Sequence, residues 1–243
     1  MPVYCITGTN RGIGLELVRQ LSRSPSNTIL ATTRPSADLT DLHAAASPTT
    51  HILPCDTADL SSVRQFAESA AKLLRDPNLR IDYLINNAGL SLSAFGAVGE
   101  SLHLEPDDVL KQISVNVLGP AKMVEYLMEK DVLADSVRVV NVSSVMGSLS
   151  KMGEMQPRRV AGYSISKAAL NMLSVHQAGD IRSRLSRAVV VVLDPGWVRT
   201  RMGGEWATLS VEECVARSLQ LVHGLGGGDN GRFLEYTGME TPW

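Results

Sequence analysis

Short runs of apolar and β-branched residues alternate along this chain with longer segments in which apolar positions recur at helical spacing. The runs typical of strands lie at residues 3–7, 28–33, 51–55, 82–85, 137–142, 188–193 and 233–236. Because parallel neighbours are joined by crossover helices, this alternation predicts a parallel sheet that helices cover on both faces. The expected fold class is therefore α/β, a doubly wound parallel sheet of about seven strands.

The segments between these runs predict helices wherever apolar residues recur at i, i+3 and i+4. These helices are expected over residues 14–23, 60–75, 107–129, 164–184 and 211–223. The run AVVVVL at residues 188–193 has no polar alternation, so we expect a strand buried on both faces near the centre of the sheet. Residues 147–160 lack a regular period and are interpreted as a loop over the site. No linker or repeat divides the chain, which favours a single domain over residues 1–243.

Composition and charge narrow the class of partner. With 23 Lys and Arg against 25 Asp and Glu, the net charge of −2 gives no electrostatic argument for nucleic acid or an anionic membrane. No stretch approaches the roughly 18 apolar residues of a membrane span, and the first residues do not resemble a signal peptide. We therefore expect a cytoplasmic protein with a small-molecule substrate. The three cysteines and five histidines lack ligand or disulfide spacing, so we expect no metal. Cys5 and Cys55 lie in apolar, strand-like runs, where we expect buried, unreactive thiols.

A glycine-rich turn, TGTNRGIG at residues 7–14, directly follows the first strand-like run and precedes a helical segment. Strand, glycine turn and helix N-terminus together form an anion site, because unpaired N–H groups and the helix dipole point toward whatever lies there. The spacing of Gly8, Gly12 and Gly14 is not G-x-G-x-x-G, and the turn lacks the Lys of a P-loop. Its place after the first strand of a doubly wound pattern makes a dinucleotide the natural ligand.

The end of the second strand-like run indicates which dinucleotide is bound. NAD-binding sites place a carboxylate there for the ribose 2′-hydroxyl, but here the chain has Arg34, and no acid precedes Asp38. Arg34 can accommodate a 2′-phosphate, with Arg11 as a second guanidinium, which favours NADP(H); a solvated surface arginine is the alternative. Asp56, after the third run, could bond the adenine amino group or cap the next helix.

Tyr163 and Lys167 lie four residues apart in a predicted helix, so they share one face. A nearby cation stabilises a phenolate and lowers the pKa of a tyrosine from its usual value near 10, which allows general acid–base chemistry at neutral pH. The Y-x-x-x-K pattern arises often by chance. The order of the other motifs along the chain is what gives it weight.

Six motifs occur in a fixed order: TGTNRGIG, NNAG at residues 86–89, SVNVLGP at 114–120, VVNVSS at 139–144, YSISK at 163–167 and DPGWVRT at 194–200. In this order the chain resembles the short-chain dehydrogenase/reductase family over essentially its whole length, which implies a Rossmann-like sheet. The stretches DPGWVRTRMGG and GRFLEYTGMETPW resemble more particularly the branch of C-factor and sniffer-type carbonyl reductases.

The resemblance implies a catalytic tetrad. Tyr163 would protonate the carbonyl oxygen during reduction, and Lys167 would lower the pKa of Tyr163 and hold the nicotinamide ribose. Ser144 would hydrogen-bond the same substrate oxygen, and Asn116 would anchor a water that relays protons to Lys167. The cofactor-binding residues would be Gly8, Asn10, Arg11, Gly12, Ile13, Gly14, Arg34, Asp56, Asn87, Ala88, Gly89, Tyr163, Lys167, Pro195, Gly196, Val198 and Thr200.

Several of these assignments have alternatives. Ser143 could replace Ser144, although strand alternation places their side chains on opposite faces and the family position favours Ser144. Asn116 could merely satisfy a backbone carbonyl. Trp197 and Trp206 could be pocket walls or pack in a core or lid.

The interval between Ser144 and Tyr163 is longer than the family usually has, with SKMGEMQPRR at residues 150–159 as the extra segment. This departure leaves open the pocket shape and the usual homodimer or homotetramer built on helix faces. We expect a substrate lid near residues 202–208.

The expected function is the reversible, NADPH-dependent reduction of a ketone, aldehyde or quinone-like carbonyl. A dinucleotide-binding signalling or regulatory protein is one alternative, and a non-redox cyclase or dehydratase on the same scaffold is another. The intact Ser144, Tyr163 and Lys167 argue against pure sensing, because binding alone would not need them.

Overall fold

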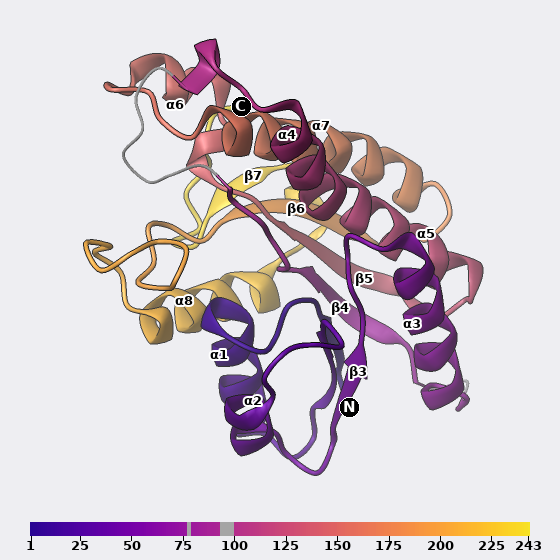
Figure 1. Cartoon of the computed structure of the whole chain (residues 1–243). Helices are drawn as coiled ribbons and strands as arrows, with labels where there is room; N and C mark the ends of the chain where they lie inside the picture. Colours follow the sequence, from indigo (N-terminus) through magenta and orange to yellow (C-terminus); the bar gives the residue numbers. More distant parts are fainter. Residues whose placement is uncertain (77–78, 93–99) are drawn as a thin grey trace.

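All seven strands belong to one parallel sheet in the order β3-β2-β1-β4-β5-β6-β7, which confirms the predicted fold class (Figure 1). The structure is a computed structural model and describes residues 1–76, 79–92 and 100–243. Its strands are β1 (Val3–Ile6), β2 (Thr28–Thr33), β3 (Thr50–Pro54), β4 (Ile81–Asn86), β5 (Leu133–Val142), β6 (Val189–Asp194) and β7 (Phe233–Glu235).

Helices cover both faces of the sheet (Figure 1). The α-helices are α1 (Gly12–Leu21), α2 (Thr40–Ala45), α3 (Leu60–Leu73), α4 (Pro106–Ile113), α5 (Gly119–Glu129), α6 (Leu149–Glu154), α7 (Ala161–Arg182) and α8 (Val211–Gly224). Short turns of other helix types are η1 (Glu100–Leu102), η2 (Ser114–Leu118), η3 (Val145–Gly147) and η4 (Gly227–Asp229). Within the described ranges, none of these helices combines the length and the apolar character that crossing a membrane requires.

Two apolar cores lie on opposite sides of the sheet. One packs strand side chains such as Ile6 and Val191 against α1 and α8, and the other packs Leu84 and Val139 against α3, α5 and α7. The three cysteines are buried, as predicted for Cys5 and Cys55, and burial raises the pKa of the Cys55 and Cys214 thiols to about 12. These thiols are therefore protonated at neutral pH.

The placement of residues 188–193 near the sheet centre is wrong. In the structure β6 lies between β5 and β7, one strand from the edge, while β4 is the central strand. All six residues of β6 are nevertheless buried. An apolar run indicates that both faces of a strand are buried. Here α7 and α8 pack on the sheet close to its edge, so a strand near the edge is buried as well. Burial therefore does not indicate the strand order.

The predicted helix at 107–129 is interrupted. Between α4 and α5 the chain forms η2, a π-helical turn that contains Asn116. Pro120 follows four residues after Asn116 and has no N–H to donate to its carbonyl, so an unbroken α-helix would lose this hydrogen bond and meet the proline ring. A π turn relieves that conflict, and such turns are frequent at functional sites.

The predicted loop at 147–160 is partly helical, because it contains α6. The Ser148 side chain caps this helix by accepting from the Lys151 N–H at 3.1 Å. Ser148 also donates to the Pro242 carbonyl at 2.6 Å, and the Ser150 hydroxyl donates to the Trp243 carbonyl at 2.6 Å. Residues about 90 positions away in the sequence therefore hold α6 in place, and no local period would show this.

Candidate active site

The predicted site residues gather at one edge of the sheet. Parallel strands all end on the same side, and the motifs follow the carboxyl ends of consecutive neighbours in space. The residues that follow strand ends are Gly8 after β1, Arg34 after β2, Asp56 after β3, Asn87 after β4, Ser144 after β5 and Pro195 after β6. Motifs separated by up to about two hundred residues in sequence thus meet at the place where doubly wound sheets bind ligands.

The glycine turn is held against the end of β4. Gly8 has a left-handed backbone with φ +71°, and a Cβ placed there would lie 3.0 Å from the Ala88 Cα. The Asn87 side chain donates to the carbonyls of Thr7 and Gly8 at 2.8 and 3.1 Å, and the Ala88 N–H donates to the Thr7 hydroxyl at 2.9 Å. Three of the predicted cofactor residues, Gly8, Asn87 and Ala88, therefore shape one turn.

The turn leads into α1, whose first N–H groups lack a side-chain cap. Arg11, the residue before α1, makes no side-chain hydrogen bond that would cap the first N–H groups of this helix. Gly12 has φ +57°, and a Cβ there would meet the Thr200 methyl group at 3.4 Å, so the loop after β6 borders the turn. Uncapped N–H groups in an open cradle fit the pyrophosphate of a dinucleotide. Asn10 and Ile13 are partly buried in this turn, and Ile13 packs toward Val198.

We expect Gly14→Ala to damage this cradle. The added Cβ would lie 2.1 Å from the Gly8 carbonyl oxygen and 2.6 Å from the Asn87 Nδ2, distances that require the turn to move. Titration of NADPH fluorescence should show affinity reduced by tenfold or more, on the order of 1.4 kcal/mol. The control is Gly179→Ala in α7, where a Cβ meets nothing within 4 Å and affinity should be unchanged. Equal affinities in both variants would contradict the tight packing.

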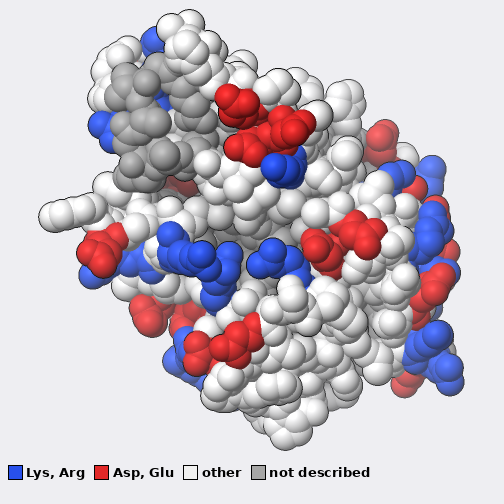
Figure 2. Space-filling model, viewed as in Figure 1, with Lys and Arg blue, Asp and Glu red and all other residues white. Residues whose placement is uncertain are grey.

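Arg11 and Arg34 lie at the same sheet edge and are exposed. Thr9 connects the glycine turn to β2, because its N–H and hydroxyl both donate to the Thr32 carbonyl, at 3.0 and 3.1 Å. Within residues 1–76, 79–92 and 100–243, neither arginine forms an ion pair with an acidic side chain. Figure 2 shows Lys and Arg side chains gathered across the middle of this face, between the part with α1 and α2 and the part with α4.

Asp56 does not cap the next helix, so that alternative is wrong. Asp59 is the residue before α3, and its carboxylate accepts from the Ser61 N–H at 2.9 Å. Asp56 instead accepts from the Ala58 N–H at 3.0 Å and is partly exposed beyond the end of β3.

Tyr163, Lys167 and Ser144 come together beside this cradle. Helix α7 begins at Ala161, three residues before the predicted start, so Tyr163 and Lys167 both lie in its first two turns. The Lys167 Nζ lies 5.6 Å from the centroid of the Tyr163 ring and donates to the Val142 carbonyl at 2.8 Å. Ser144 hydrogen-bonds the Tyr163 phenol from the end of β5. The end of β5 and one helix, α7, thus position the three groups.

Burial dominates the electrostatics of this cluster. Desolvation lowers the pKa of Lys167 to about 8. Desolvation, with a smaller contribution from the negative charge of Asp194, raises the pKa of Tyr163 above its usual range, and the Ser144 hydrogen bond opposes that rise. The expected lowering of the tyrosine pKa by Lys167 is therefore not what the structure shows. The phenol is protonated at neutral pH, which is the form that can donate a proton.

The adjacent residues Ser143 and Ser144 lie in different surroundings. Ser143 is buried, and its hydroxyl donates to the Asn171 Oδ1 at 2.6 Å beneath α7. Ser144 faces the Tyr163 side and is partly exposed. Strand alternation thus separates them as predicted, with Ser144 on the open side.

Asn116 is fully buried, and its side chain hydrogen-bonds to Leu90 and Ser166. The Asn116 Nδ2 donates to the Leu90 carbonyl and the Ser166 hydroxyl, both at 2.8 Å, while its Oδ1 accepts from the Leu90 N–H at 2.8 Å. A Cβ on Gly89 would lie 3.7 Å from both the Asn116 Oδ1 and the Lys167 Nζ, so the three residues meet. The side chain therefore satisfies the backbone groups of Leu90, which agrees with the alternative assignment.

The loop after β6 borders the glycine turn on one side. Pro195 and Val198 are buried, Gly196 has φ +79°, and Thr200 is partly exposed beside Gly12. Val198 pairs with Leu209, so the chain between them returns on itself.

Of the two tryptophans on this loop, Trp206 is 85% exposed, so it packs in no core within the described structure. The Trp197 indole N–H donates to the Gly203 carbonyl at 2.8 Å, which fixes its ring on the loop.

Sequence reasoning missed two residues at the site. A Cβ on Gly147 would lie 2.8 Å from the Lys167 carbonyl carbon, so only glycine allows the Ser144 turn to approach α7. Asn171 lies eight residues after Tyr163 on the same helix face, and its Nδ2 donates to the Gly147 carbonyl at 3.1 Å. The polar spacing of Tyr163, Lys167 and Asn171 on one buried face is a signal that could have identified Asn171.

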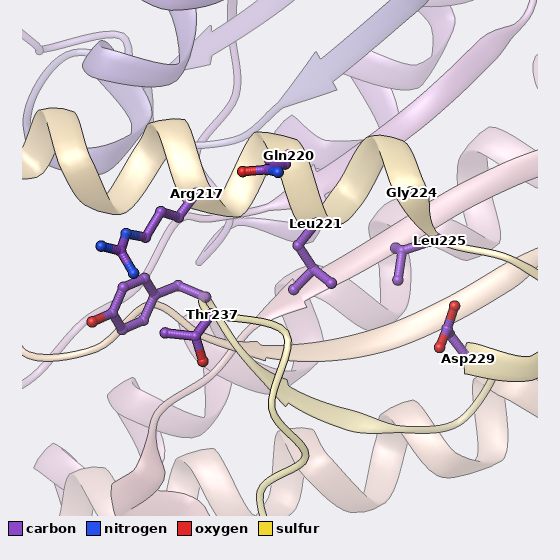
Figure 3. A pocket seen from close by; sticks show the side chains of 8 residues that line it. Arg217, Gln220, Leu221, Gly224, Leu225, Asp229 and Thr237 are labelled. Carbon is purple, nitrogen blue, oxygen red and sulfur yellow. The ribbon is translucent and has the colours of Figure 1, made fainter.

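A hollow of about 370 Å³ lies elsewhere, between α8 and the segments around η4 and β7 (Figure 3). It is lined by Arg217, Gln220, Leu221, Gly224, Leu225, Asp229, Tyr236 and Thr237, and none of these is a predicted site residue. The Arg217 guanidinium is paired with Glu213 at 2.8 Å, and Asp229 is paired with Arg232 at 3.0 Å. The charges around this hollow are therefore already partnered within the chain.

Comparison with known proteins identifies the family of this chain. The model of the family described as short chain dehydrogenase matches residues 2–209. The "C-signal" protein of Myxococcus xanthus is 36% identical over 67% of this chain and 93% of its own length, and an uncharacterized oxidoreductase of Schizosaccharomyces pombe is 28% identical over 99% and 98%.

Among solved structures, an NADPH-bound carbonyl reductase from chicken fatty liver matches with a TM-score of 0.88 and 28% identity, covering both chains completely. The carbonyl reductase Sniffer of D. melanogaster matches with a TM-score of 0.89 and 26% identity, also over both whole chains. A family match across most of the chain, with relatives and folds that agree along its length, shows that this chain belongs to the short-chain dehydrogenase family.

Proposed function

We propose that this protein reduces a ketone, aldehyde or quinone-like carbonyl with NADPH, and that it can run the same reaction in reverse. The observation that carries the proposal is the meeting of Ser144, Tyr163 and Lys167 beside the glycine cradle. Solved structures of similar fold, described as an NADPH-bound carbonyl reductase and the carbonyl reductase Sniffer, support the same chemistry.

Bound NADPH would supply a hydride to the carbonyl carbon. The glycine turn with Gly8, Gly12 and Gly14 would hold the pyrophosphate, and Lys167 would hold the nicotinamide ribose. The Ser144 hydroxyl would donate a hydrogen bond to the carbonyl oxygen, which would orient it toward Tyr163. The Tyr163 phenol would then give its proton to that oxygen, which completes the alcohol.

The proton that leaves Tyr163 must be replaced. Lys167 lies beside the phenol, and below its pKa of about 8 it carries a proton on Nζ. The Asn116 side chain lies near Lys167 across Gly89, and Asn116 would anchor a water that relays protons to Lys167.

Arg34 and Arg11 support NADPH as the cofactor. Both guanidinium groups are exposed and unpaired with acids in the described part of the chain, at the end of β2 and in the turn after β1. We expect Arg34→Asp to weaken NADPH binding and to shift the ratio of kcat/KM for NADPH over NADH toward NADH by about 100-fold or more, because a carboxylate repels the 2′-phosphate. Arg23→Asp, on the turn after α1, is the control. An unchanged cofactor ratio in the Arg34 variant would remove the argument for NADP(H).

We further propose one domain over residues 1–243, with residues 202–208 as a lid. Met202 and Trp206 on that loop are 46% and 85% exposed, apolar surface that a bound substrate could cover.

Leu110 on α4 and Met172 on α7 are also well exposed, which supports pairing of two copies through these helices.

A screen tests the proposed function. Purified protein is incubated with NADPH and chemically diverse carbonyl compounds, consumption of NADPH is followed by absorbance, and the products are identified. Formation of the matching alcohol supports the proposal. Product that forms without NADPH oxidation would indicate a non-redox catalyst, and tight NADPH binding without any turnover would favour the regulatory alternative suggested by the relative named "C-signal".

A further inference from the structure

Ser148 is a buried serine that joins three separate parts of the chain. It directly follows η3, and 0% of its surface is exposed. Its N–H donates to the Val145 carbonyl at 3.0 Å within η3, and its hydroxyl oxygen accepts from the Lys151 N–H at 3.1 Å in α6. The same hydroxyl donates to the Pro242 carbonyl at 2.6 Å. One side chain therefore connects the turn after Ser144 to a segment near the end of the sequence.

The turn η3 also holds the Ser144 hydroxyl. The Ser144 Oγ accepts from the Met146 N–H at 3.2 Å, and the Ser144 carbonyl accepts from the Gly147 N–H at 2.8 Å. A hydroxyl whose oxygen accepts from a backbone N–H can still donate its own proton to another group. The direction in which Ser144 donates therefore depends on the conformation of η3.

Two different parts of the fold hold η3 in place. On α7, the Asn171 Nδ2 donates to the Gly147 carbonyl at 3.1 Å, and a Cβ on Gly147 would lie 2.8 Å from the Lys167 carbonyl carbon. The second support is the hydrogen bond from Ser148, at the end of η3, to the Pro242 carbonyl. Loss of the Ser148 hydroxyl would leave the turn with its support on α7.

The Pro242 carbonyl belongs to a segment that β7 fixes in place. The Thr241 N–H donates to the Phe233 carbonyl at 2.8 Å, and the centroid of the Trp243 ring lies 5.4 Å from that of the Phe233 ring. Ser150 adds a link to α6, because its N–H and its hydroxyl donate to the Trp243 carbonyl at 3.1 and 2.6 Å. In Figure 1, α6 and the end of the chain accordingly lie side by side. The segment is therefore a firm support for η3.

Capping of α6 explains only part of what Ser148 does. A helix cap requires an acceptor, which Asp and Asn also supply, and it makes no use of the serine proton. Here that proton is donated to a carbonyl 94 residues away in the sequence. This second hydrogen bond fixes where the turn lies relative to the sheet, which a cap alone does not do.

We propose that Ser148 is a positioning residue for the carbonyl reduction: its hydrogen bond to the Pro242 carbonyl fixes the turn that directs the Ser144 hydroxyl toward the substrate oxygen. This inference rests on the proposed function, because Ser148 acts through the hydrogen bond that Ser144 would donate. A displacement of about 1 Å in a site can reduce the rate by about 100-fold, so a turn held less firmly lowers kcat. The glycine turn does not contain Ser148, and NADPH affinity is therefore retained.

The test is a double-mutant cycle between Ser148 and Ser144. Turnover of a carbonyl compound that the wild type reduces is measured at saturating NADPH for the wild type, Ser148→Ala, Ser144→Ala and the double variant. Each kcat is divided by the number of NADPH-binding sites found by fluorescence titration, so that a loss of folded protein does not count as a loss of turnover.

We expect Ser148→Ala to lower kcat by about tenfold, with NADPH affinity within about threefold of the wild type. In the Ser144→Ala background the same substitution should lower kcat by less than about twofold, because the hydroxyl that Ser148 positions is then missing. Lys151→Ala is the control on α6, because this side chain pairs with Glu154 at 3.4 Å on the surface of the same helix. It should retain the wild-type kcat.

An unchanged kcat in Ser148→Ala would overturn the inference, and so would an equal fall in both backgrounds, which would show that Ser148 does not act through Ser144. If Ser148→Ala does not fold, Trp243→Ala replaces it, because this substitution removes the ring that packs on Phe233 beside the Pro242 carbonyl. We then expect kcat to fall by about threefold or more, again only where Ser144 is present.

Failure of both variants to fold would assign these contacts to the fold alone and reject the inference. The two levels of the argument fail differently. A wild type that reduces no carbonyl would reject the proposed function and this inference with it, whereas a wild type that turns over beside an equally active Ser148→Ala would reject the inference alone.

Discussion

Tyr163→Phe is expected to abolish carbonyl reduction while NADPH still binds. The substitution removes only the phenolic oxygen, which hydrogen-bonds Ser144 and lies on the same helix face as Lys167. Loss of a general acid reduces kcat by about 100- to 10,000-fold. The glycine turn and Arg34 are unaffected, so the dissociation constant for NADPH should change by less than about threefold, within roughly 0.7 kcal/mol.

The measurement combines single-turnover kinetics with fluorescence titration of NADPH. Tyr126→Phe on α5 is a matched control, because this buried ring packs under the Arg64 guanidinium at 4.1 Å and is not one of the predicted site residues. It should retain wild-type turnover. A Tyr163→Phe variant that reduces its substrate at a comparable rate would show that another group supplies the proton.

Lys167→Met is expected to impair both cofactor binding and turnover. Nζ is buried with the whole side chain, which is 3% exposed, and it is the cation nearest to Tyr163 among the described contacts. Methionine keeps the length of the side chain without the charge. We expect NADPH affinity to fall by about tenfold and kcat by about 100-fold or more. Lys122→Met, on an exposed Lys paired with Glu125 at 2.7 Å, should affect neither.

The pH dependence supplies an independent check on Lys167. Its pKa of about 8 means that the ammonium loses its proton as pH rises through that value, so reduction by the wild type should decline above about pH 8. The residual activity of Lys167→Met should lack this decline. A wild-type profile that stays flat to pH 10 would contradict the role of a protonated Lys167.

As pH rises above about 8, the stability contributed by Lys167 should increase, whereas the activity should decrease. The folded pKa of Lys167 lies below its ordinary value of 10.5, so between about pH 8 and 10.5 the unfolded chain binds this proton more tightly than the folded chain. The free energy of unfolding of the wild type should therefore rise relative to Lys167→Met across that window. Denaturant unfolding at a series of pH values measures this difference, and equal slopes in both proteins would contradict the desolvation of Lys167.

Local patterns were enough to predict several features of this site. The Tyr163 and Lys167 spacing places both on one helix face whatever the tertiary fold, and Gly8 and Gly14 mark a turn that a Cβ would block. The alternation of strand-like and helical segments predicted the parallel sheet, because hydrophobic periodicity depends on which faces are covered. These features are set by neighbouring residues, so a linear reading reaches them.

Other features depend on which distant segments meet. The π turn at Asn116 reflects its packing on Leu90 and Ser166 as well as Pro120, and α6 is held by carbonyls of Pro242 and Trp243. The burial of Asp194 also depends on the tertiary fold, because in the sequence this residue is simply one acid in a motif at a strand end.

By itself, then, the sequence determined the fold class, the strand ends that carry the motifs and the identity of the polar groups that meet there. Only the tertiary structure decided the strand order, the approach of Gly147 to α7, and that burial rather than the Lys167 charge controls the protonation of Tyr163. The physical reason is that desolvation and close approach are properties of the assembled environment, to which residues far apart in the chain contribute together.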